Sequence, residues 1–144
     1  MRIAFLILAD YGESLNGKLY TLGAGFNALQ FPELPQEWRF SVGMGIDVPW
    51  DETNQRHSLE LVIQDPDGNE LGEEFEMEFE AGRPPGMPAG QEQRLVLAIN
   101  VGATFETPGP HALIVRSGEE ELERARFYLV EVEVPEGPVQ FGGP

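Results

Sequence analysis

A regular alternation of apolar and polar residues runs through the segment 38–48 and limits most strongly what this chain can fold into. Every second position carries a large apolar side chain, and smaller or polar residues fill the positions between them. Successive side chains of a β-strand point to opposite faces of the sheet, so the pattern predicts a strand with one buried face. The apolar positions are Trp38, Phe40, Val42, Met44, Ile46 and Val48, and the others include Ser41, Gly43, Gly45 and Asp47.

Similar short apolar runs recur along the chain, separated by glycine and proline. No segment has a sustained helical period, although residues 119–126 are compatible with one helical turn. About eight short strands bounded by turn residues are typical of a sandwich of two antiparallel sheets. We therefore predict an all-β sandwich with an immunoglobulin-like Greek key, and a jelly roll is the alternative strand order. The expected strands include 3–10, 18–22, 26–31, 38–48 and 95–101, with a hairpin turn at 65–69.

The first expected strand, 3–10, is apolar at consecutive positions rather than at alternate ones. Its odd positions Ile3, Phe5 and Ile7 alternate with Ala4, Leu6 and Leu8. Such a run is typical of a strand with both faces covered. We expect this strand to lie inside its sheet.

The chain length limits the number of domains. With 144 residues, of which 41% are hydrophobic, the chain can bury one sizeable core. We expect a single domain over residues 1–134 and a flexible tail over residues 135–144, which are rich in glycine and proline. Cysteine is absent, which excludes disulfides and fits a reducing compartment. The apolar start is too short to span a bilayer, so we expect a cytoplasmic protein that does not bind membranes.

The formal net charge of −16 narrows the class of partner. Nucleic-acid binders concentrate lysine and arginine, whereas only nine such residues are spread along this chain, so nucleic acid is not an expected partner. Carboxylates on solvated strand faces keep copies of a protein apart in solution, which is the simplest interpretation. A basic partner or a cation is the alternative.

Asp65, Asp67 and Asn69 stand at alternate positions, as the first oxygen ligands of a calcium loop do. The pattern then departs from an EF-hand loop, which has glycine at its sixth position, whereas Gly68 is at the fourth. We interpret the segment as a hairpin turn. The alternative is a cation site that acidic residues of other loops, such as Asp47, Asp51 and Glu52, would complete.

Four glutamates follow one face of a predicted strand, with carboxylates about 7 Å apart along the row. They are Glu74, Glu76, Glu78 and Glu80. We interpret the row as a solvated outer face that discourages aggregation between sheet edges, and a dock for a basic partner is the alternative. A flat row offers no cleft for the carboxylate pair of a glycosidase.

No catalytic constellation stands out in the sequence. His57 and His111 are the only histidines, so a three-histidine zinc site is impossible. The serines lack the surroundings of a nucleophile elbow, and the glycines at 23–25 lack the rest of a phosphate-binding fingerprint. We expect a protein that is not an enzyme and needs no cofactor.

Ser41, Gly43 and Gly45 predict a bare outer face on the strand 38–48. Glycine within a strand often marks the close approach of another backbone or a ligand. A bulge or internal packing explains these residues most simply. The functional alternative is a second copy, or an extended peptide, lying flat on this face with Trp50 at its side.

Several short motifs near the N-terminus point to a family. In order they are Leu8-Ala9-Asp10, Gly17-Lys18-Leu19, Leu22-Gly23-Ala24-Gly25-Phe26 and Pro32-Glu33-Leu34-Pro35. They resemble the opening of a bacterial family of short proteins known only as a domain of unknown function. The resemblance covers the first quarter of the chain closely and the rest more loosely, and it implies no activity.

These observations favour a non-enzymatic β-sandwich that acts by protein contact. The expected partner is either a copy of itself, in a homo-oligomer, or another bacterial protein. The alternative is a domain that binds a small ligand or a cation with its inter-strand loops, and an enzyme acting on carbohydrate ranks third.

Overall fold

The computed structural model of this protein describes residues 1–132, which form nine strands and one short 3₁₀ helix. The predicted tail at 135–144 lies outside the described residues. In chain order the elements are β1 (Arg2–Leu15), β2 (Lys18–Ala24), β3 (Ala28–Phe31), β4 (Gln36–Val48), η1 (Trp50–Glu52), β5 (Arg56–Gln64), β6 (Glu70–Glu80), β7 (Gln93–Phe105), β8 (Gly109–Ser117) and β9 (Glu120–Glu131).

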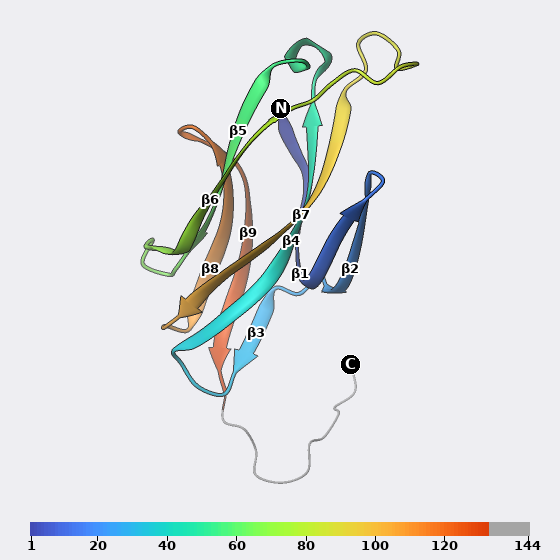
Figure 1. Cartoon of the computed structure of the whole chain (residues 1–144). Coiled ribbons are helices and arrows are strands. Elements are labelled where there is room, and N and C mark those ends of the chain that lie inside the picture. The colour runs from blue at the N-terminus through green and yellow to red at the C-terminus, as the bar shows by residue number, and fades with distance from the viewer. Residues whose placement is uncertain (133–144) are drawn as a thin grey trace.

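The strands form two sheets that pack together, as Figure 1 shows. The first sheet has the order β2-β1-β4-β7, and the second has the order β3-β9-β8-β5-β6. The prediction of an all-β sandwich is confirmed. The expectation of wholly antiparallel sheets is wrong at one pair, because β3 runs parallel to β9. No hairpin joins these two strands, so chain connectivity does not force them to be antiparallel.

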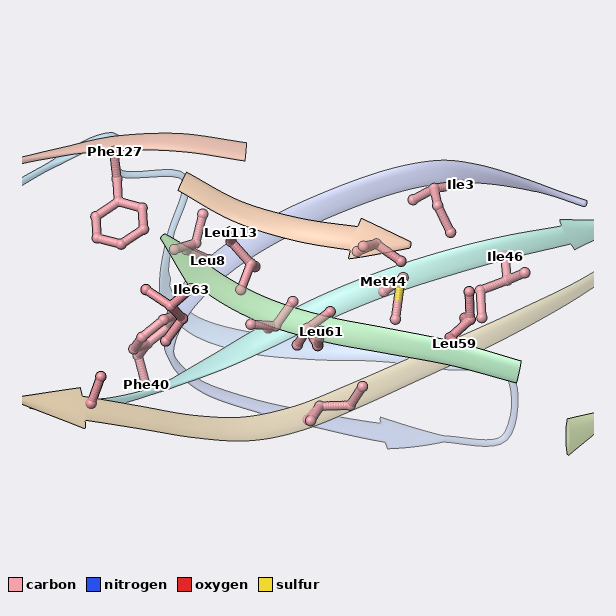
Figure 2. Close-up of a cluster of buried hydrophobic side chains, with 14 of the residues drawn as sticks. Ile3, Leu8, Phe40, Met44, Ile46, Leu59, Leu61, Ile63, Leu113 and Phe127 are labelled. Atoms are coloured by element: carbon pink, nitrogen blue, oxygen red, sulfur yellow. The ribbon is translucent and has the colours of Figure 1, made fainter. Parts of the chain in front are cut away.

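The hydrophobic core lies between the sheets (Figure 2). The alternate residues of β4 that the sequence predicts to be buried face this core, and from Phe40 to Val48 they are at most 2% exposed. Trp38 closes one end by stacking on Phe40, with ring centroids 4.2 Å apart. The second sheet contributes Leu59, Leu61, Ile63, Leu113, Val115, Phe127 and Leu129.

β1 bends near Asp10, so its two halves have different partners (Figure 1). Its first half pairs with β4, and its second half pairs with β2 in a hairpin that turns back over the outer face of the first sheet. The Ser14 hydroxyl donates a hydrogen bond to the Val96 carbonyl of β7, at 2.6 Å. We call residues 11–22 the folded-back hairpin.

Side chains of β1 and of the folded-back hairpin explain the glycines of β4. A Cβ atom at Gly43 would lie 2.5 Å from Leu19 Cδ2, and one at Gly45 would collide with the Phe5 ring. The Ser41 hydroxyl donates to Asn100 Oδ1 at 2.7 Å. All three positions are buried, so the expectation of a bare outer face is wrong, and internal packing is the reason.

The expectation that the first strand lies inside its sheet is confirmed.

The helical turn with which residues 119–126 are compatible does not form, because these residues belong to β9 or to the turn before it. β9 pairs with β8, and the register shifts between Val115 and Arg116. This irregularity interrupts the alternation of inward and outward side chains along β9. As a result Leu122 and Ala125, which are three residues apart, both pack on the core. Residues 1–132 contain no α-helix, and thus none long and apolar enough to cross a membrane.

Gly43→Ala tests the packing beneath the folded-back hairpin. The added methyl group meets Leu19, and overpacking of this kind costs about 1–3 kcal/mol of unfolding free energy. We expect urea unfolding to show that Gly43→Ala combined with Leu19→Ala costs less than the sum of the single changes, because Leu19→Ala removes the colliding atoms. Gly82→Ala is the control, since nothing lies within 4 Å of its added atom. Fully additive losses would contradict this packing.

Candidate functional site

The outer side of the folded-back hairpin gathers four of the most exposed large apolar side chains. Tyr11 is 52% exposed, Leu15 and Tyr20 are each 53% exposed, and Leu22 is 69% exposed. The pairing of Tyr11 with Leu22, together with the alternation along both strands, places all four on one side. We call these four residues the hairpin face.

The local sequence makes this hairpin regular and holds it in place. Asn16 and Gly17 form its two-residue turn with φ values of 52° and 72°, which suit the right-handed twist of the flanking strands. On the inner side, Leu19 packs over Gly43, and Ser14 bonds to Val96. These contacts on the inner side therefore hold the hairpin face in a defined position on the first sheet.

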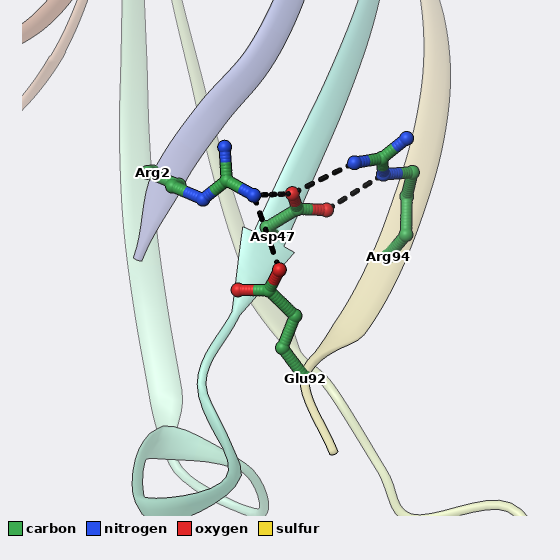
Figure 3. A network of polar contacts seen from close by, with 4 residues as sticks. All are labelled: Arg2, Asp47, Glu92 and Arg94. Carbon is green, nitrogen blue, oxygen red and sulfur yellow. Dashed lines mark hydrogen bonds and ion pairs between the residues drawn. The ribbon is translucent and has the colours of Figure 1, made fainter.

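Ion pairs at one end of the first sheet join three strands around Asp47 (Figure 3). Arg94 of β7 donates two hydrogen bonds to the Asp47 carboxylate, at 2.6 and 2.8 Å, and an Arg2 nitrogen of β1 lies 2.7 Å from it. The Asp47 side chain is 1% exposed. The hydrogen bonds from Arg94, with the charges of Arg94 and Arg2, hold the pKa of Asp47 below its usual range against the effect of burial.

Trp50 begins the 3₁₀ helix η1 beyond this end of the sheet, and its ring is in contact with another loop. The Arg83 guanidinium lies over its ring, 3.8 Å from the ring centroid. Arg83 also donates to the Trp50 carbonyl at 2.8 Å and to the Thr53 hydroxyl at 2.6 Å. Trp50 thus ties two loops together.

The residues proposed for a calcium loop form a self-contained hairpin turn between β5 and β6. One Asp65 oxygen accepts hydrogen bonds from the backbone N–H groups of Asp67 and Asn69, at 2.9 and 2.8 Å. Asp51 precedes β5 and Asp65 follows it, so the strand's nine residues, about 30 Å in length, separate them. The structure confirms the turn and does not bring these acids together.

The glutamate row instead meets a residue that sequence reasoning missed. Glu60 of β5 is the pairing partner of Glu76, and oxygens of Glu60, Glu74 and Glu76 lie within 4.8 Å of one another. The hydrogen bond with Glu60 and the charge of Glu74 raise the pKa of Glu76. Arg116 donates to Glu60 at 2.8 Å, and this bond lowers the pKa of Glu60. The strand register, which no local pattern reveals, creates this cluster.

Both histidines make structural contacts. His57 Nε2 donates to the Glu52 carbonyl at 2.7 Å. His111 Nδ1 donates to the Gly109 carbonyl at 3.0 Å, and its ring packs on Phe127 with centroids 5.6 Å apart. Within residues 1–132, neither ring is hydrogen-bonded to a serine or threonine hydroxyl.

Asp47→Asn is expected to lower the free energy of unfolding at pH 7 by about 1–3 kcal/mol, since it weakens charge-assisted hydrogen bonds. Because the pKa of Asp47 is lowered in the folded state, its stabilising effect is present above the unfolded pKa of about 3.9 and is lost as the pH falls through the folded value. Urea unfolding at pH 7 and pH 3 should therefore show a smaller difference between the two proteins at pH 3. A difference independent of pH would contradict this account.

Glu76→Gln is expected to raise the melting temperature at pH 7, because it removes one of three crowded carboxylates. The raised pKa of Glu76 means that its charged form is disfavoured in the folded state, so the original protein gains stability as the pH falls towards that pKa. Glu78→Gln is the control, because Glu78 lies 3.6 Å from an Arg56 nitrogen. Equal shifts from both variants in thermal unfolding would refute the crowding argument.

Comparison with known proteins identifies a family without an assigned activity. No curated protein matches this chain. A family model described as a family of unknown function, DUF6941, matches residues 4–130 and thus takes in the folded-back hairpin, Asp47 and the glutamate cluster. The predicted membership of an uncharacterised domain family is confirmed well beyond the N-terminal motifs. The chain belongs to the family of unknown function DUF6941.

Proposed function

We propose that this protein is a non-enzymatic module for protein contact and that the hairpin face is its contact surface. One observation carries this proposal: Tyr11, Leu15, Tyr20 and Leu22, each more than half exposed, gather on one side of one hairpin. Exposed apolar side chains that gather in this way are typical of interaction sites, whereas single ones are ordinary.

The character of the hairpin face supports a protein partner. Tyrosine is enriched in the core of protein interfaces, because it offers a large apolar ring and a polar hydroxyl. The surface is also preorganised: the Asn16–Gly17 turn and the contact of Leu19 with Gly43 hold it before any partner arrives. Less ordering is then required on binding.

The strand order supports an immunoglobulin-like form of the sandwich. In an immunoglobulin domain the first sheet contains strands A, B and E side by side, and the second contains G, F and C, to which variable domains add C′. The runs β1-β4-β7 and β9-β8-β5-β6 match these two orders when β1 is taken as strand A. We therefore favour the immunoglobulin-like arrangement over a jelly roll.

Composition supports a proposal for the compartment in which the contact is made. A chain without cysteine fits a reducing compartment, so we propose that the contact is made in the cytoplasm of a bacterial cell. The alternative, a domain that binds a cation or small ligand through its loops, has less support. The turn itself occupies the Asp65 carboxylate, and Arg116 pairs with Glu60 of the glutamate cluster.

Photo-cross-linking tests the contact surface. Tyr20 is replaced by a benzophenone-bearing phenylalanine, and the full chain is irradiated in its own cells. We expect one discrete cross-linked product, which Leu22→Ser removes. Tyr128 is the matched control position, because it is a tyrosine of similar exposure, 49%, on β9. No product from position 20, or the same product from both positions, would refute the proposed surface.

A further inference from the structure

We propose that a second copy of this chain binds the hairpin face. In this dimer the β2 strands of the two copies pair with each other in antiparallel orientation. This inference rests on the proposed function and names the partner for the same surface. It depends on three properties of the folded-back hairpin: a free strand edge, the local absence of net charge, and a spacing of side chains that matches itself.

The free edge belongs to β2. Among the described strands, β2 pairs only with β1, so the backbone N–H and C=O groups on its other side have no partner strand. Natural edge strands are commonly protected by charged side chains. The edge strand β6 carries a row of glutamates, whereas β2 carries Lys18 at its start and no other charge. β2 is therefore open to pairing.

Charge selects a second copy over a basic partner. With a net charge of −16, two copies repel each other over most of their surfaces, and a basic protein would be drawn to the glutamates of β6. Residues 11–22 contain one acid, Glu13, and one base, Lys18, and thus have no net charge. A second copy meets the least repulsion at this hairpin.

The side chains of β2 match themselves about a two-fold axis. A dimer with such an axis uses the same patch on both copies. When the two β2 strands overlap fully over Lys18–Ala24, Thr21 lies opposite Thr21 of the second copy, and Tyr20 lies opposite Leu22 of the second copy. Aromatic residues that face aliphatic ones across two strands stabilise a sheet. Because Tyr11 already pairs with Leu22, the apolar row continues from one copy into the other.

Sedimentation velocity of the untagged full chain tests this pairing. We expect a dimer whose fraction rises with concentration and with added salt, because salt screens the repulsion between acidic copies. Leu22→Lys should raise the dissociation constant at least about tenfold, since it places a charge at a central contact. Val130→Lys is the control: it makes the same charge change at an exposed apolar residue of β9 and should leave the dimer intact. Near-UV circular dichroism confirms that both variants fold.

A cysteine placed on the two-fold axis tests the register. Since the chain has no cysteine, Thr21→Cys introduces the only one. Mild oxidation should give a disulfide-linked dimer in high yield, whereas Gly82→Cys, at an exposed loop position, should give little. Equal yields from the two variants would overturn the proposed register.

The outcomes separate this inference from the proposed function. A monomer at every concentration, or equal effects of Leu22→Lys and Val130→Lys, would overturn the second copy as the partner. If Tyr20 then cross-links to a different protein, the contact surface stands and only its occupant changes. A monomer with no cross-linked product refutes both. A dimer that Leu22→Lys alone dissociates supports both.

Discussion

The close approach of the folded-back hairpin to β4 is the contact on which the rest of this structure depends. β4 lies in the middle of the first sheet and presents the core residues Phe40 to Val48 on its inner side. On its outer side, Gly43 and Gly45 leave room for Leu19 and Phe5. Both faces of the strand are therefore buried over residues 40–48, and the first sheet lies between the main core and a second layer that the folded-back hairpin forms. The hairpin face is exposed because the opposite side of the same hairpin is used in this packing.

The electrostatic layout complements this packing. The one buried carboxylate of β4, Asp47, has arginine partners from both neighbouring strands, so ion pairs join the three strands at this end of the first sheet. Most of the remaining acidic excess lies at exposed positions, as along β6, where Arg116 and Arg56 offset only part of it. The electrostatic repulsion between two copies is thus concentrated away from the hairpin. This repulsion opposes general aggregation, although one surface of the molecule is apolar.

Much of the fold is predictable from the sequence, because alternation and turn residues are local signals. The β4 pattern, the β5–β6 turn and the two-sheet class all follow from them. Four features do not follow from local signals, and three of them depend on non-local contacts. The glycines of β4 show that something approaches closely, but only the tertiary structure shows that Leu19 of the folded-back hairpin faces Gly43 and that Phe5 of β1 faces Gly45. The irregular pairing near Val115 hides the alternation of β9. The register of β5 against β6 brings Glu60 to Glu76, and the hairpin face escapes notice because its alternation is short and partly polar.

The Ser14–Val96 hydrogen bond has a consequence for how far sheets of this kind can grow. Each sheet of a two-sheet sandwich has two edge strands, so the molecule has four edges. Growth into a fibre requires that at least two of these edges on each molecule are free to pair. Here a hydroxyl of the hairpin takes up a carbonyl of the edge strand β7, the edge strand β3 has only four residues and ends before Pro32, and glutamates protect β6. Among the four edges of the described sheets, the β2 edge is the least protected. The proposed pairing of two β2 strands would use this edge in both copies, so assembly by this route would end at a dimer rather than continue into a fibre.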